Sequence, residues 1–276
     1  MTLTATAETA LPYGLTRPIH IGAVGLKAKD VGRVADYYRT LLGLETIAST
    51  GGTERLGAGG VAFLEIAPLA SDGLPDDTRS AGLFHTAFLM PSRADLGRWI
   101  LRASEKRLAV DGMSDHLVSE AIYLTDPEGN GVEIYADRPH EGWKWDHGRV
   151  EMSTLALDLR PIVASAGAAP KPYDVAPDGL RIGHVHLRVG NHAEAERWWI
   201  SEVGLQPMAH YPGATFLASG GYHHHIAGNA WQSRGAGPRD PKRSGLAWVE
   251  LTGSGIAAGK ELVDPWGTVV RLTPGS

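Results

Sequence analysis

The sequence contains no cysteine among its 276 residues. This absence excludes disulfides, thiolate metal sites, iron–sulfur clusters and a cysteine nucleophile. It also fits a reducing compartment, and we expect a cytoplasmic protein. No apolar run approaches the roughly 20 residues that span a bilayer, so we expect no membrane partner. Residues 1–16 have neither the basic start nor the apolar centre of a signal peptide, and we expect a mobile N-terminal arm there.

The sequence also lacks an excess of basic residues. Lys and Arg total 26 against 31 Asp and Glu, which gives a net charge of −5. A general nucleic-acid binder needs a basic face, so we expect no nucleic-acid partner. Glycine and histidine are plentiful, with 35 and 12 residues. The glycines indicate many tight turns between short strands, and any metal site must use histidine with Asp or Glu, because cysteine is absent.

A repeated order of strand, helix and three strands runs through the chain. The first unit begins with an alternating strand, Ile19–Leu26, which a helix follows between Asp30 and Gly43. Its last three strands are predicted at Glu45–Thr50, Thr53–Leu56 and Val61–Ala67. The other units open with strands at Leu83–Met90, Ile182–Val189 and Leu246–Leu251, and the fourth unit keeps only a vestige of a helix.

Short internal echoes support the repeat. The turn Asp126-Pro-Glu-Gly129 in the second unit matches Asp264-Pro-Trp-Gly267 in the fourth. We therefore predict modules 1 and 2 over residues 17–138, a linker over 139–181 with an extra strand at 151–159, and modules 3 and 4 over 182–276.

Four such units resemble the vicinal-oxygen-chelate superfamily of glyoxalases, antibiotic-resistance proteins and extradiol dioxygenases. The resemblance implies an α+β fold in which four βαβββ modules pair into two eight-stranded, cup-shaped half-barrels with helices outside. It also implies that a cup holds a metal ion, with ligands from the first and last strands of its modules. Often only one of the two cups is active.

The ligand positions that the resemblance implies can be read module by module. The first-strand position is His85 in module 2 and His184 in module 3, but Ala23 and Trp248 in modules 1 and 4. The last-strand position is Glu133 in module 2 and Arg271 in module 4, and arginine cannot bind a metal. Two imidazoles and one carboxylate match the facial triad of non-haem iron oxygenases. One metal can use all three only if modules 2 and 3 form the active cup. The competing interpretation is that these are ordinary packed or solvated strand residues.

Further residues resemble the second shell of extradiol dioxygenases. Tyr123 lies ten residues before Glu133, as does the substrate-facing tyrosine of that family, and His116 falls where the family places a polar residue near the catechol. The segment Gly220-Gly-Tyr-His-His-His225 resembles the strand of the acid–base histidine. If Ile226 faces the helices, alternation turns His223 and His225 into the cup and His224 away, so we expect His225 to be catalytic. An adventitious metal clamp or a surface cluster is the alternative.

The resemblance implies an extradiol dioxygenase that opens a catechol-type ring with O2 at a site with Fe2+, or alternatively Mn2+. His225 would transfer the proton, Tyr123 would bind the substrate oxygen, and His116 would position the ring. A glyoxalase-like isomerase or lyase and a non-enzymatic drug-binding resistance protein remain the alternatives. A homo-oligomer and a substrate contact by His223 or one of the tryptophans 143, 145 and 231 are left open.

Overall fold

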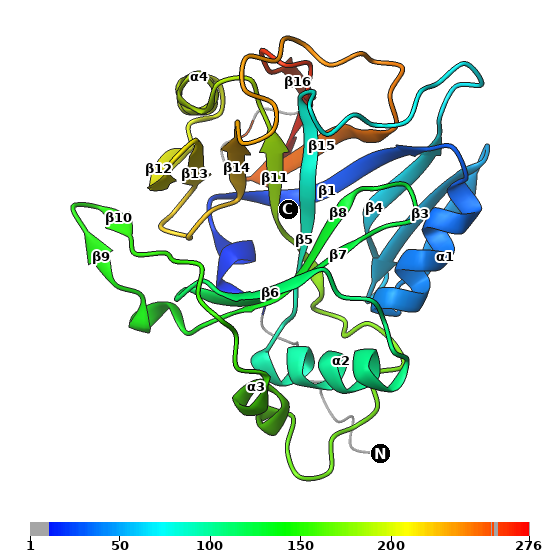
Figure 1. The fold of residues 1–276 in the computed structure, drawn as a ribbon, viewed down its shortest axis with the longest axis vertical. Coiled ribbons are helices and arrows are strands. Elements are labelled where there is room, and N and C mark those ends of the chain that lie inside the picture. The colour runs from blue at the N-terminus through cyan, green and yellow to red at the C-terminus, as the bar shows by residue number, and fades with distance from the viewer. Residues whose placement is uncertain (1–10, 255, 257–258, 276) are drawn as a thin grey trace, which may run out of the picture.

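The computed structural model describes residues 11–254, 256 and 259–275 (Figure 1). Module 1 follows a short 3₁₀ helix, η1 (Tyr13–Thr16), and contains β1 (Ile19–Ala28), α1 (Val31–Leu42), β2 (Glu45–Thr50), β3 (Thr53–Ala58) and β4 (Val61–Pro68). Module 2 contains β5 (Gly82–Leu89), α2 (Arg93–Glu105), β6 (Gly112–Asp115), β7 (Ser119–Thr125) and β8 (Gly131–Asp137).

The second half of the chain repeats this order less completely. The linker forms η2 (His140–Gly142), β9 (Trp145–Asp146), β10 (Arg149–Val150) and α3 (Leu159–Ser165). Module 3 contains β11 (Arg181–Arg188), α4 (His192–Trp198), the π-helical turn η3 (Trp199–Val203), β12 (Gln206–Tyr211), β13 (Ala214–Ala218) and β14 (Ile226–Asn229). Module 4 contains β15 (Gly245–Gly253), β16 (Lys260–Val263) and β17 (Val269–Pro274).

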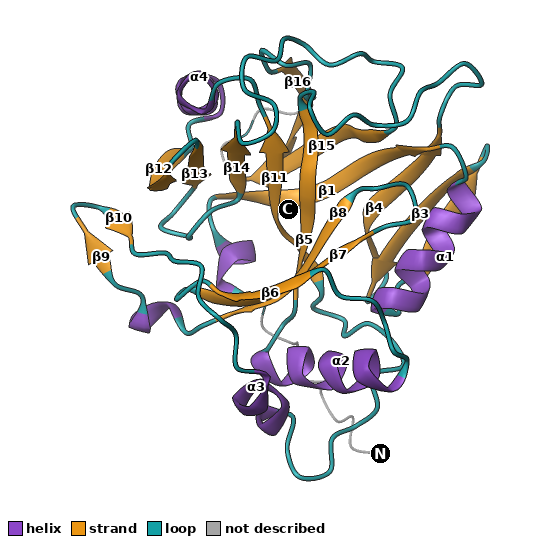
Figure 2. Ribbon diagram, viewed as in Figure 1, coloured by secondary structure: helices purple, strands orange, loops and turns teal. Residues whose placement is uncertain are grey.

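Two large mixed sheets combine the modules in an unusual pairing. One has the order β12-β13-β14-β11-β5-β8-β7-β6 and so joins modules 3 and 2. The other has the order β16-β17-β15-β1-β4-β3-β2 and joins modules 4 and 1. Figure 2 shows the helices outside the curled sheets. The α+β class is confirmed, but the second sheet has seven strands among the described residues, where eight were expected, because module 4 contributes only three.

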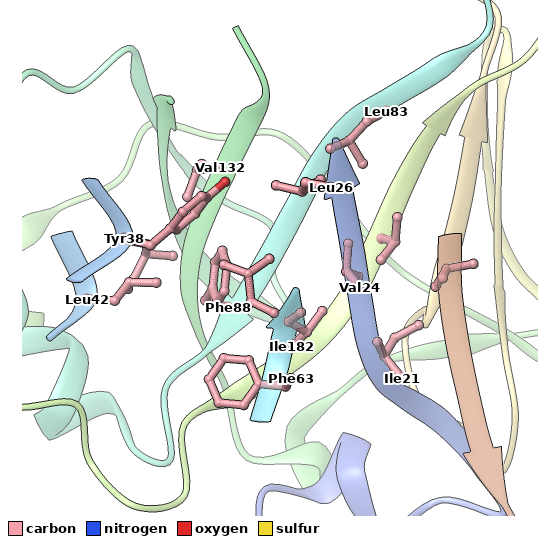
Figure 3. Close-up of a cluster of buried hydrophobic side chains, with 14 of the residues drawn as sticks. Ile21, Val24, Leu26, Tyr38, Leu42, Phe63, Leu83, Phe88, Val132 and Ile182 are labelled. Carbon is pink, nitrogen blue, oxygen red and sulfur yellow. The ribbon is translucent and has the colours of Figure 1, made fainter. Parts of the chain in front are cut away.

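The main hydrophobic core lies where the two sheets meet. Val24 and Leu26 of β1 pack there with Phe88 of β5 and Ile182 of β11, all almost completely buried (Figure 3). Helix α1 adds Tyr38 and other apolar side chains to the same cluster. Because this core covers one face of β5 and β11, their opposite face is left to line a cavity.

Local sequence signals explain the helix ends. Asp30 accepts a hydrogen bond from the Arg33 amide at the start of α1, and Gly43 ends the helix in the left-handed conformation, with φ of 69°. At α2, Ser92 caps in the same way by accepting from the Asp95 amide. Such caps supply partners for the first free amides of a helix.

Two expectations, one for the N-terminal arm and one for the linker, need correction. Residues 1–10 of the expected arm lie outside the described residues, but the arm does not reach residue 16, because Tyr13–Thr16 form η1 and Leu15 is buried. The extra strand expected at 151–159 is reduced to one bridge between Leu155 and Asp115. Helix α3 follows instead, with Asp158 as its cap. None of the described helices is long and apolar enough to cross a bilayer.

Candidate metal centre and its cavity

The strand register of the eight-stranded sheet brings three predicted ligands together on one face. Ala87 of β5 is paired with Glu133 of β8 on one side and with His184 of β11 on the other. His85 lies two residues before Ala87 and therefore projects from the same face of β5. The small side chain of Ala87 leaves the space between the three larger ones free.

The three donor atoms converge on one point. Nε2 of His85 lies 3.0 Å from Oε2 of Glu133, Nε2 of His184 lies 3.2 Å from the same oxygen, and the two Nε2 atoms are 3.3 Å apart. Three ligands bound at about 2.1 Å and at right angles would lie about 3.0 Å apart. The group therefore fits three adjacent positions around one divalent ion, with the remaining positions open.

Burial and charge prepare these groups to bind a cation. Burial raises the pKa of Glu133, but the neighbouring His184 and His85 outweigh it and hold that pKa well below its usual range. Burial lowers the pKa of His184 to about 4, although Glu133 acts in the opposite direction. At neutral pH the group thus contains a carboxylate and an unprotonated His184, the states in which these side chains bind metals.

A buried aspartate, Asp126, lies in the turn before the strand that carries Glu133. Oδ1 of Asp126 accepts hydrogen bonds from the amides of Glu128 (2.8 Å) and Asn130 (2.9 Å), and its Oδ2 accepts one from the Asn130 side chain (2.8 Å). Asp264 accepts from the amides of Trp266 and Thr268 in the same way. The repeated Asp-Pro-x-Gly turn therefore has a structural cause, since the aspartate shapes the turn before the last strand of modules 2 and 4.

Tyr123 and His116 form a pair beside the triad. Tyr123 lies opposite Glu133 in the β7–β8 register, and its hydroxyl lies 2.6 Å from Nε2 of His116. Nδ1 of His116 lies 2.7 Å from the carbonyl oxygen of Ser153, so Nδ1 carries the hydrogen and Nε2 accepts from Tyr123. Burial raises the pKa of Tyr123 well above its usual range, so the phenol stays protonated. Its oxygen keeps free acceptor capacity.

The histidine triplet departs from the alternation that we expected. His224 lines the cavity, and its ring centre is 4.1 Å from that of His184. His225 is fully buried and is not among the cavity-lining residues; its Nε2 lies 2.9 Å from the Gly14 carbonyl oxygen, and its Nδ1 accepts from the Ser219 amide. The orientation expected for His224 and His225 is therefore wrong. Its cause is local, because β14 begins only at Ile226 and the triplet lies in bends, where strand alternation does not apply.

A cavity of about 490 Å³ opens over the triad and reaches Tyr123, His116 and His224. Its wall is largely aromatic and apolar, with Phe84, Met152, Tyr211, Phe216 and Trp231. Arg188 also faces it, but this guanidinium is 4% exposed and is held by Asp76 and by the Ser80 carbonyl oxygen. Such a cavity suits a planar, uncharged ring.

Sequence reasoning missed two residues of this cavity. His186 lies two positions after His184 on the same strand, is buried, and contacts the Asn229 side chain through Nε2. The spacing in Gly183-His-Val-His-Leu187 could have identified it, because alternate strand residues share a face. His224 was missed through the false assumption of a regular strand. Of the three tryptophans left open, Trp231 lines the cavity, Trp143 lies in a separate buried cluster and Trp145 is exposed.

The equivalent positions of the seven-stranded sheet carry different chemistry. In its register Ala23 is paired with Glu250, and Glu250 with Arg271, in the places of His184, Ala87 and Glu133. The Arg271 guanidinium lies 4.2 Å from the centre of the Trp248 ring, which occupies the place of His85. In this cup a cation stacks on an aromatic ring, and Ala23, Trp248 and Arg271 offer no metal ligand.

Comparison with known proteins agrees with this geometry. The model of the Glyoxalase/Bleomycin resistance protein/Dioxygenase superfamily matches residues 20–134. A catechol-2,3-dioxygenase of Bacillus subtilis (strain 168) is 37% identical over 236 residues, which cover 84% of this chain and 82% of that protein. Biphenyl-2,3-diol 1,2-dioxygenase 3 of Rhodococcus globerulus is 36% identical over 95 residues, which cover 33% of this chain and 50% of that protein.

The fold is also found in solved structures of low sequence identity. Glyoxalase I from Zea mays superposes with a TM-score of 0.55 at 14% identity, over 95% of this chain and 94% of that one. This similarity concerns the fold alone.

Proposed function

Because the chain belongs to the Glyoxalase/Bleomycin resistance protein/Dioxygenase superfamily, we propose that it opens a catechol-type ring next to its two hydroxyls, using O2 and Fe2+. The chain is an oxidoreductase of the extradiol dioxygenase type, as its relatives are. The observation that carries the proposal is the convergence of His85, Glu133 and His184 at the floor of an aromatic cavity.

These three side chains would hold the metal. Fe2+, when bound, supplies open positions for the two oxygens of a catecholate and for O2, together with the redox chemistry that joins them. Mn2+, another divalent first-row ion, which favours carboxylate ligands, is the alternative metal. The protein contributes the shape of the cavity, which places the ring in one orientation and keeps bulk water away from it.

Tyr123 and His116 would bind one catechol oxygen. Since the Tyr123 hydroxyl donates to Nε2 of His116, its oxygen is free to accept a hydrogen bond from a substrate hydroxyl. The pair then orients that hydroxyl above the triad.

His224 would move the proton, in place of His225. Its ring lies against His184 in the cavity, and burial lowers its pKa well below the usual value, so it is a neutral acceptor. His225 has both nitrogens engaged by backbone groups of Gly14 and Ser219. A general base within reach of a substrate hydroxyl contributes about 10²–10⁴-fold to a rate.

The alternatives fit less well. A glyoxalase-like isomerase would require more carboxylate at the metal, and the triad contains Glu133 alone. A drug-sequestering protein would need no metal ligands.

Iron binding and oxygen uptake test the proposal together. Protein loaded anaerobically with Fe2+ should bind one iron per chain and consume one O2 per catechol in an oxygen electrode. Glu133→Gln should lose both properties, whereas Glu250→Gln, the control at the other sheet, should keep them. Iron-loaded protein that takes up no oxygen with any of several simple and substituted catechols would refute the proposal.

A further inference from the structure

Asp137 starts a line of buried hydrogen bonds that ends at the cavity. It closes strand β8, four residues after Glu133. Its Oδ1 lies 2.9 Å from Nε2 of His223, and Nδ1 of His223 lies 2.8 Å from Nδ1 of His224. His224 in turn lines the cavity beside His184. These three side chains, Asp137, His223 and His224, are called the Asp–His–His chain below.

The Asp–His–His chain is held rigidly away from water. The side chain of His223 is 0% exposed and that of Asp137 is 13% exposed. The rings of Tyr222 and Trp143 pack against His223, with centres 4.0 and 5.3 Å from its own. The Tyr222 hydroxyl also donates to Oδ1 of Asp137 at 3.2 Å, which fixes the carboxylate at the far end.

The direction of these hydrogen bonds follows from the carboxylate. An ionised carboxylate only accepts, so Nε2 of His223 must carry a hydrogen. A neutral imidazole has a single N–H, and Nδ1 of His223 is then an acceptor. The bond to His224 therefore requires the hydrogen of His224 on Nδ1, which leaves Nε2 of His224 without one. No other described residue forms a hydrogen bond with that nitrogen.

We propose that Asp137 and His223 are positioning residues, which hold the His224 ring at the cavity wall and keep its Nε2 free to accept a proton from the bound substrate. A carboxylate that sets the tautomer of a catalytic histidine is an established device, here extended by one imidazole. The catalytic part of this inference rests on the proposed function, whereas the tautomer of His224 does not.

A purely structural role for the Asp–His–His chain makes different predictions. Buried polar groups stabilise a fold when their hydrogen bonds are satisfied, whichever nitrogen carries the hydrogen. Removing them would then reduce the free energy of unfolding without a specific effect on turnover. The experiment must therefore read out the tautomer and the rate constants separately.

The tautomer can be measured without turnover. We would record long-range ¹H–¹⁵N correlation spectra of the imidazoles in the zinc-loaded full-length protein at pH 8, and assign His224 by the signals lost in His224→Gln. The expected result is a hydrogen on Nδ1 and none on Nε2. A His224 that carries its hydrogen on Nε2, as it would opposite a doubly protonated His223, overturns the proposal.

The kinetic test uses His223→Phe in the iron-loaded protein, because phenylalanine keeps the ring and removes both hydrogen bonds. We expect kcat for a catechol to fall about 10²–10⁴-fold, with KM within about threefold and the iron content unchanged. His20→Phe is the matched control, a half-buried histidine of the seven-stranded sheet, and should keep kcat. Asp137→Asn should lower kcat at least about tenfold, with Asp264→Asn as its control.

Two results would contradict the positioning role. An unchanged kcat in His223→Phe would show that the Asp–His–His chain is structural only, and loss of iron would show that it supports the metal site instead. If the wild type were inactive with every catechol while His224 showed the expected tautomer, the proposed function would fail and the hydrogen-bond direction would stand.

Discussion

The two half-barrels differ in chemistry through single side chains at equivalent positions. Equivalent places carry His184 in one sheet and Ala23 in the other, and Glu133 in one and Arg271 in the other. The backbone register is the same in both, so the difference in chemistry resides in these residues. One cup offers two imidazoles and a carboxylate, and in the other an arginine stacks on Trp248.

The first prediction for a single residue concerns the carboxylate of Glu133. Glu133→Gln replaces an anionic ligand with a neutral amide, and iron affinity should fall more than the about 10–100-fold typical of losing an outer-shell partner. Iron titration followed by metal analysis measures this. Glu250→Gln makes the same change at the equivalent level of the other sheet, and an equal loss of iron there would contradict the assignment of the site.

A second prediction concerns His225 and the loss of folding stability at acidic pH. Burial lowers its pKa to about 3, from an ordinary value near 6.5, so the folded state keeps it neutral. Its contribution to stability is therefore complete above pH 6.5 and is lost as the pH falls towards 3, at up to about 1.4 kcal/mol per pH unit.

Urea unfolding at several pH values between 7.5 and 4.5 checks this. His225→Gln should be less stable than the wild type at pH 7.5, because its hydrogen bonds change, but should lose less stability between pH 6.5 and 4.5. An identical slope in both proteins would show that His225 does not contribute to the acid sensitivity.

Secondary-structure elements explain why part of the site could be predicted. The regular strands β5, β8 and β11 obey alternation, so His85, Glu133 and His184 could be placed on one face from sequence. The histidine triplet could not, because Gly220 and Gly221 adopt positive φ and the chain bends before β14. The seven rather than eight strands of the other sheet, counted over the described residues, and helix α3 also escaped prediction. Short elements such as α3 depend on tertiary packing.

The turns before β8 and β17 give a prediction about stability and iron binding. Asp126→Ala and Asp264→Ala each remove a buried carboxylate that satisfies backbone amides, and each should reduce the free energy of unfolding by about 1–3 kcal/mol. Only Asp126→Ala should also weaken iron binding, because its turn starts the strand of Glu133. Equal iron affinity in both variants would contradict this link, and denaturant unfolding with iron titration measures both effects.

At the scale of the whole molecule, the described residues form two cups and bring one candidate metal-binding group together. Modules 2 and 3 share the sheet that carries the triad, and modules 1 and 4 pack behind it through the common core. This division lets one sheet devote its inner face to a cavity of about 490 Å³, while the shared core covers the other face.

The cavity wall predicts which substrates are preferred. Arg188 is occupied by Asp76, so a carboxylate on the substrate would lose its hydration without gaining a free cation from this residue. Neutral catechols with alkyl or aryl substituents should have kcat/KM values at least about tenfold above those of ring-carboxylated catechols. Steady-state assays with matched pairs test this, and a preference for the carboxylated ring would contradict it.

The structure of the reaction product tests the central claim most directly. Iron-loaded protein, catechol and O2 should give the yellow, ring-opened product with one aldehyde and one carboxylate, identified by mass spectrometry and NMR. That product requires cleavage beside the two hydroxyls, which is the reaction proposed for a metal held by His85, Glu133 and His184. A product with two carboxylates, or unchanged catechol in the presence of fully iron-loaded protein, would contradict the account.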